Sequence, residues 1–236
     1  MPDVNPDQPI LILGGFLITE EAYTPLASWL QTNHGLTVKV VPSSKIDWFL
    51  TSWRFGWKRL LDRVDRIVHE LKAQSPTGKV TLIGHSSGGV MLRLYLGDKS
   101  FAGRIYSGYR HVNRLVMLGS PNQAVRATAL RALVDRLYPG CTFSDYVDYV
   151  SVAGILDPNG EDASWFSRNS FQISYEKIMC DADALGDGLV PLDSAILLNS
   201  KRFVLENTAH AGLFGRYWYG SPACIEKWWP LVVQAN

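Results

Sequence analysis

The sequence predicts an α/β protein, built on a mostly parallel, doubly wound sheet of about six strands with helices on both faces. The main observation is the alternation of short apolar runs with longer segments of helical periodicity, which is typical of parallel strands joined by crossover helices. The second is the length of 236 residues, which is enough for one domain with a large core. The third is a composition of 47% hydrophobic and 19% charged residues, as in globular chains.

Each expected element follows from the local pattern of apolar residues. A continuous apolar run such as Ile10-Leu11-Ile12-Leu13 is typical of a strand buried on both faces, whereas apolar residues three and four apart predict a helix. Pro42 stops the second strand, because proline has no N–H to donate to a neighbouring strand. In chain order we expect a strand over 10–13, a helix over 20–32, a strand over 37–41, a helix over 62–73, a strand over 80–83, a helix over 90–96, a strand over 112–119, a helix over 124–137, strands over 146–154 and 202–206, and a helix over 225–233.

Two segments lie outside the expected strands and helices, and the second of them has few periodic signals. Residues 46–57 are densely aromatic, and residues 156–188 are expected to form a long loop. The segments 43–57 and 155–185 are therefore candidates for a lid or for the wall of a substrate pocket. No internal repeat, low-complexity tract or linker divides the chain, so we expect residues 1–236 to form a single domain.

Composition and charge exclude several classes of function. A net charge of +1 gives no electrostatic reason to expect nucleic acid as a partner. The polar start over residues 1–9 lacks the features of a secretion signal, and no apolar run is long enough to cross a bilayer. Cys141, Cys180 and Cys224 are an odd number of widely spaced cysteines, which favours reduced thiols. We expect a cytoplasmic protein without a transmembrane segment; peripheral membrane contact and the oligomeric state stay open.

The most informative motif is the turn Gly84-His85-Ser86-Ser87-Gly88, which lies between an expected strand and an expected helix. This Gly-x-Ser-x-Gly pattern is typical of a nucleophile elbow, in which a sharp turn holds the serine in strained backbone above the sheet. Ser86 is then the candidate nucleophile, and the N–H of Ser87 can stabilise a developing oxyanion at the helix start. The alternative is an ordinary glycine-rich turn of an α/β protein.

A reactive serine needs a base and a carboxylate that orients the base, both on loops at the carboxyl ends of the strands. His210 is the candidate base, because it follows the last expected strand in a loop of small residues. Asp187 is the leading candidate acid, since its flanking glycines allow a tight turn, although Asp-Gly turns are common. Asp157 and Asp183 are alternatives, and His85 inside the turn is expected to pack or to support the site.

Other residues are candidates for the oxyanion hole and the substrate pocket. Two glycines after the first strand allow a close backbone approach, so the N–H of Phe16 is the second candidate oxyanion donor. An aromatic lining would favour an acyl or prenyl chain, whereas core packing is the alternative interpretation. The candidate substrate-binding residues are Leu17, Trp48, Trp53, Trp165 and Phe166.

Taken in order, these motifs resemble the α/β-hydrolase superfamily, and within it the small bacterial triacylglycerol lipases and lipase-like esterases. The resemblance extends from Ile10 to Trp229 and includes Gly119-Ser120-Pro121 and the run from Gly186 to Pro191. It implies a Ser86-Asp187-His210 triad with Phe16 and Ser87 as oxyanion donors. It further implies hydrolysis of a small-molecule or lipid ester through an acyl-enzyme.

Three further classes of function remain to be weighed. An acyltransferase or a thioesterase would use the same triad. A non-catalytic hydrolase-fold binding protein would commonly lack one member of the triad, and the presence of all three candidates argues against it. A cofactor enzyme is disfavoured, because no dinucleotide or phosphate-binding glycine motif follows a strand. No spacing of metal ligands occurs either, so neither a cofactor nor a metal is expected.

Overall fold

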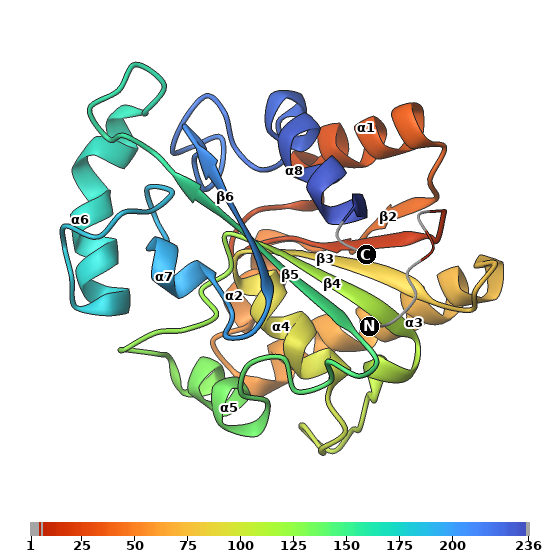
Figure 1. The fold of residues 1–236 in the computed structure, drawn as a ribbon. Helices are drawn as coiled ribbons and strands as arrows, with labels where there is room; N and C mark the ends of the chain where they lie inside the picture. The colour runs from red at the N-terminus through yellow and green to blue at the C-terminus, as the bar shows by residue number, and fades with distance from the viewer. Residues whose placement is uncertain (1–4, 6, 235–236) are drawn as a thin grey trace.

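The computed structural model describes residues 5 and 7–234; residues 1–4 and 6 of the polar start lie outside this description. The described residues form a six-stranded, all-parallel sheet with the strand order β2-β1-β3-β4-β5-β6 (Figure 1). The predicted fold class, a doubly wound α/β sheet, is confirmed. The strands are β1 (Ile10–Leu13), β2 (Val38–Val40), β3 (Val80–His85), β4 (Val112–Leu118), β5 (Asp148–Ile155) and β6 (Lys201–Glu206).

Helices cover both faces of this sheet (Figure 1). They are η1 (Glu20–Tyr23), α1 (Thr24–His34), α2 (Lys45–Leu50), α3 (Arg54–Gln74), α4 (Ser87–Leu96), η2 (Gly108–Arg110), α5 (Ala129–Leu137), α6 (Trp165–Met179), α7 (Leu192–Ala195) and α8 (Pro222–Gln234). Side chains of α1 and α8 belong to the core on one face, and those of α3, α4 and α5 to the core on the other. Among the described helices, none has the length and apolar composition that crossing a membrane requires.

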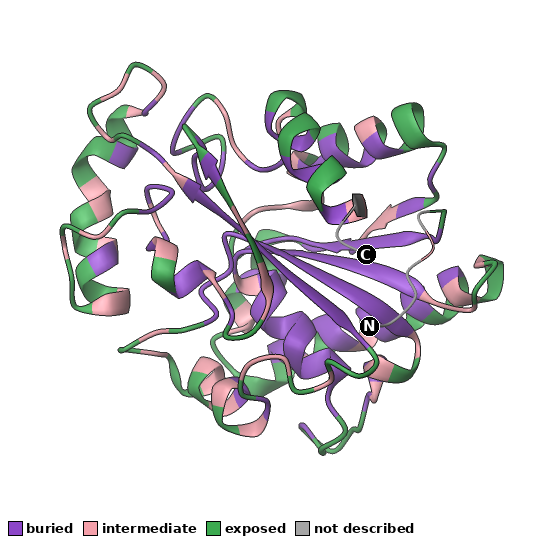
Figure 2. Ribbon diagram, viewed as in Figure 1, coloured by how far each residue is buried: buried purple, intermediate pink, exposed green. Residues whose placement is uncertain are grey.

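The first strand shows how the apolar runs are used. Successive side chains of a strand point to opposite faces, so Ile10 and Ile12 join the core under α1 and α8, and Leu11 and Leu13 the core under α3 and α4. All four side chains are at most 1% exposed. Figure 2 shows the central strands buried along their length. Burial on both faces explains why these strands read as continuous apolar runs rather than as alternating patterns.

The sequence interpretation was wrong about the stretch 156–188. We expected a loop, but this stretch contains the 15-residue helix α6 (Trp165–Met179). Only Ser167 and Tyr175 of α6 are buried, so the helix leaves no apolar stripe that a periodicity argument can detect. Helix α3 likewise begins at Arg54, eight residues before the predicted start at 62, and α5 begins at Ala129 rather than at 124.

The strand order places a crevice at the carboxyl ends of β1 and β3. The chain runs from β1 outward to β2 and then returns to β3 on the other side of β1. The loops that leave β1 and β3 therefore separate at their carboxyl ends, which is where open α/β sheets bind ligands. Phe16 follows β1 and Ser86 follows β3, so both lie at this switch point.

Candidate active site

Ser86 lies on a tight and strained turn between β3 and α4. Its backbone has φ 52° and ψ −126°, a conformation that is rare for a residue with a side chain. A Cβ atom added to Gly84 would lie 2.4 Å from Gly89 Cα, and one added to Gly88 would lie 2.3 Å from the carbonyl oxygen of Gly14. Only glycine fits these two positions, because strand and helix backbones are in contact there. This is the geometry that a nucleophile elbow requires.

His210 and Asp187 form a buried pair at the same end of the sheet. His210 Nδ1 lies 2.9 Å from Asp187 Oδ2, and both residues are 1% exposed. The His210 backbone N–H also donates to the Asp187 carbonyl oxygen at 2.8 Å, so the two loops are joined twice. With Nδ1 donating to the carboxylate, Nε2 of His210 is left as the proton acceptor. The structure thus brings together the predicted acid and the predicted base.

Four hydrogen bonds fix the Asp187 carboxylate. Oδ1 accepts from the backbone N–H groups of Leu189 and Val190 at 3.1 and 2.8 Å, and Oδ2 accepts from His210 and from the hydroxyl of Tyr219 at 2.9 Å. Burial and the nearby carboxylate raise the pKa of Tyr219, so its hydroxyl stays protonated and donates. The alternative acids Asp157 and Asp183 are both exposed.

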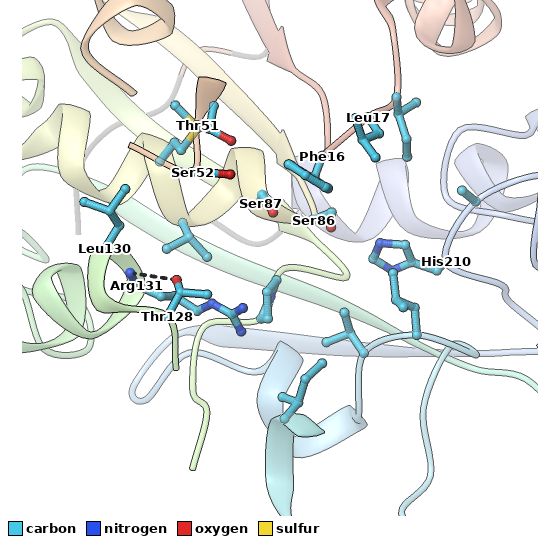
Figure 3. A pocket seen from close by; sticks show the side chains of 18 of the residues that line it. Phe16, Leu17, Thr51, Ser52, Ser86, Ser87, Thr128, Leu130, Arg131 and His210 are labelled. Atoms are coloured by element: carbon cyan, nitrogen blue, oxygen red, sulfur yellow. Dashed lines mark hydrogen bonds between the residues drawn. The ribbon is translucent and has the colours of Figure 1, made fainter. Parts of the chain in front are cut away.

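Ser86 and His210 line the same cavity, and Figure 3 shows the ring of His210 turned toward Ser86. No hydrogen bond joins the two side chains within the described structure. In enzymes without substrate such bonds are often long and tighten only when substrate binds. Transfer of a proton from Ser86 to His210 therefore requires a side-chain movement that brings the two groups into hydrogen-bond contact.

A second buried network links the loop after β1 to the elbow and to the His210 loop. The Gly15 N–H donates to the Tyr23 hydroxyl at 2.8 Å, and that hydroxyl lies 2.7 Å from His85 Nδ1. His85 Nε2 lies 2.8 Å from the carbonyl oxygen of His210. A carbonyl can only accept, so Nε2 carries the proton and Nδ1 accepts from Tyr23. His85 thus contacts both loops by hydrogen bonds, and its supporting role stays a prediction.

Stability should respond to pH through His85. Burial, with a smaller contribution from His210, holds the pKa of His85 well below its ordinary value of 6.5. Below pH 6.5 the unfolded chain therefore binds a proton at His85 that the folded protein does not, so folding stability falls as pH falls. This one group contributes about 1 kcal/mol per pH unit until its folded pKa is reached. Between pH 7.5 and pH 5, the melting temperature of the wild-type protein should fall further than that of His85→Gln. Equal falls in the two proteins would contradict this prediction.

The two predicted oxyanion donors flank Ser86. The loop after β1 lies against the start of α4, as the close approach of Gly88 to Gly14 shows, and both Phe16 and Ser87 line the cavity. Among the described residues, no acceptor takes up the backbone N–H of Phe16 or of Ser87. Two free N–H groups beside a serine are the arrangement that stabilises a tetrahedral intermediate.

The cavity beside Ser86 has a volume of about 710 Å³ and a largely apolar wall. Of the predicted substrate-binding residues, Leu17 and Phe166 line it. Trp48 is completely buried in the core, and Trp53 and Trp165 are exposed and lie outside the cavity wall. The segments 43–57 and 155–185 each contribute to the wall, through residues such as Thr51 and Ile178. Their role as a lid stays a prediction.

Several residues of the site carried no signal in the sequence. Tyr23 and Tyr219 come from η1 and from the loop before α8, and each hydrogen-bonds to the site through its hydroxyl and packs its ring near that of His85. Arg131 lines the cavity from α5. None of the three lies in a motif, and only the fold brings them near Ser86. Within the described residues, no group of three or more histidine, cysteine, aspartate or glutamate side chains could hold a metal ion.

No protein-family model matches the sequence, and neither does any curated protein sequence. Among solved structures, the chain is similar to a protein from Xanthomonas campestris pv. campestris that is ascribed to the alpha/beta superfamily of hydrolases. That likeness has a TM-score of 0.55 and 13% identity over 97% of this chain and 99% of the other. The chain is also similar to lipase B of Aspergillus fumigatus, with a TM-score of 0.47 and 13% identity over 85% of this chain and 44% of the lipase. The first likeness shows that the protein has the α/β-hydrolase fold, which confirms the predicted resemblance at the level of the fold.

Proposed function

We propose that the protein is a serine hydrolase that cleaves carboxylic esters. Ser86 is the nucleophile, His210 the base, and Asp187 the group that orients His210. The observation that carries the proposal is the buried Asp187–His210 pair at 2.9 Å, placed beside a serine in strained backbone at the start of α4. A buried Asp–His pair or a strained serine alone does not indicate catalysis. Together they can activate the serine hydroxyl as a nucleophile.

The reaction proceeds in two halves. Ser86 Oγ attacks the ester carbonyl while His210 Nε2 takes the hydroxyl proton, and the N–H groups of Phe16 and Ser87 hold the oxyanion. His210 then gives its proton to the departing alcohol, which leaves an acyl group on Ser86. In the second half a water molecule attacks the acyl group, with His210 again accepting and returning the proton, and the acid is released.

The wall of the cavity favours an ester with a lipid-like or acyl group. It presents aromatic and aliphatic side chains from several elements, and a volume of about 710 Å³ is within the range of small-molecule sites. An acyltransferase or a thioesterase would use the same three residues and would differ in the acceptor or in the leaving group. Adding a competing alcohol to the assay and analysing the products separates hydrolysis from transfer.

A fluorophosphonate probe tests the proposal directly, because it reacts covalently with activated serines. Wild type should be labelled, and Ser86→Ala should not. Ser52→Ala removes another hydroxyl of the cavity wall and should still be labelled. A panel of p-nitrophenyl esters then tests the substrate class. Absence of labelling in folded wild-type protein would refute the proposal, and a rate that collapses beyond acetate would refute the lipid-like substrate.

A further inference from the structure

The cavity beside Ser86 contains a charge that the proposed ester hydrolysis does not use. Arg131, in the first turn of α5, is the only residue with a permanent charge among the described residues that line the cavity. Figure 3 shows its guanidinium extending from α5 toward the interior of the pocket, across from His210. The rest of the wall consists of apolar side chains, several hydroxyls and the His210 ring. A single positive charge in a largely apolar wall is unfavourable unless a negative group pairs with it.

Among the residues that the structure describes, none accepts a hydrogen bond from the side chain of Arg131. It makes no hydrogen bond or ion pair with any described residue, and its Nη1 is buried without a partner. The nearest acid on the same helix, Asp135, is occupied by Arg93, whose Nη1 lies 3.0 Å from Asp135 Oδ1. Burial lowers the pKa of Arg131, which indicates a loss of hydration, and the nearby Asp135 carboxylate offsets part of this effect without forming a hydrogen bond or ion pair with it; the arginine keeps its charge. An unpaired, partly dehydrated cation destabilises the free protein.

The position of Arg131 on helix α5 adds to this destabilisation. Arg131 lies in the first turn of α5, after the N-cap Thr128, whose hydroxyl accepts from the Arg131 backbone N–H at 3.4 Å. The positive end of the helix dipole disfavours a cation there and favours an anion. Thr128, Ala129 and Leu130 also line the cavity, so the helix terminus and the guanidinium face the same space. Both features would be stabilised by one negative group in the cavity.

We infer that Arg131 binds an anionic group of the substrate, and that the preferred ester carries a carboxylate on the part that enters the cavity. A guanidinium matches a carboxylate with two parallel hydrogen bonds. One cation in an apolar wall balances a single negative charge, whereas a dianionic phosphate would leave a second charge buried without compensation. The apolar remainder of the wall would hold the carbon chain between the carboxylate and the ester. The inference rests on the proposed function and narrows its substrate class.

Two p-nitrophenyl esters of equal chain length provide the test: the hexanoate, which ends in a methyl group, and the hydrogen adipate, which ends in a carboxylate. Wild type should have the higher kcat/KM for the adipate ester. Arg131→Met should lower kcat/KM for that ester about ten- to hundredfold, mainly through KM, and leave the hexanoate rate equal or higher. Arg131→Lys should recover part of the preference, and Arg136→Met, an exposed position on the same helix, should change neither rate.

A second measurement does not depend on turnover. Free adipate should bind to Ser86→Ala protein in a calorimetric titration, and Arg131→Met in that background should weaken the binding by a similar factor. An Arg131→Met enzyme that keeps the wild-type ratio for the two esters would overturn the inference while leaving ester hydrolysis intact. Failure of the proposed function looks different, because then neither ester is hydrolysed and no probe labels Ser86. In that case the adipate titration alone decides whether Arg131 binds carboxylates.

Discussion

Replacing His210 with alanine is expected to lower kcat for p-nitrophenyl butyrate by about a millionfold. The hydroxyl of Ser86 is a weak nucleophile until a base takes its proton. His210 is the only side chain in the described cavity wall that can act as that base near neutral pH, because Arg131 stays protonated. Residual activity above the uncatalysed rate should remain, because the oxyanion donors and the cavity are unchanged. Steady-state rates, together with a melting curve to verify folding, provide the measurement.

The matched control is His69→Ala, which makes the same replacement at an exposed position on α3. It should leave kcat and KM unchanged. If His210→Ala kept kcat within tenfold of wild type, another group would have to supply the base, and the proposed mechanism would be wrong. A His210→Ala protein that fails to fold would be replaced by His210→Gln, which retains most of the side-chain volume.

The second large effect concerns Asp187→Asn, for which we expect kcat to fall by about 10⁴-fold with little change in KM. In wild type, Oδ1 of Asp187 accepts two backbone N–H groups, and Oδ2 accepts from Nδ1 of His210. An asparagine would keep its oxygen toward the backbone donors, so its NH₂ group would face Nδ1. The His210 proton would then move to Nε2, and the ring could no longer accept the proton of Ser86.

Two other aspartates serve as controls for this prediction. Asp157 and Asp183 are the acids that the sequence left as alternatives, and both are exposed. Asp157→Asn and Asp183→Asn should retain wild-type kcat. A large loss in either variant, with activity retained in Asp187→Asn, would reassign the acid. The rate of fluorophosphonate labelling should follow the same order as kcat in all three variants, because it depends on the same base.

The predicted sheet could be read from the sequence because its strands are buried on both faces. Short runs such as Ile10–Leu13, flanked by proline and glycine, are typical of such strands, and strands alternating with helices leave few topologies. The elbow was equally clear, since a sharp strand-to-helix turn permits only small residues around Ser86. In contrast, α6 was missed, because a helix that buries only Ser167 and Tyr175 has no periodic apolar face to detect.

The sequence by itself determined the fold class, the serine and the loop that holds the candidate base, because each depends on residue types at neighbouring positions. Only the tertiary structure showed which of the candidate aspartates contacts His210. Asp187 is the one whose carboxylate reaches His210, through loops that leave different strands. The tertiary structure also placed the unpaired guanidinium of Arg131 in the same cavity as Ser86. Contacts between distant segments depend on how elements pack, and no local pattern along the chain records them.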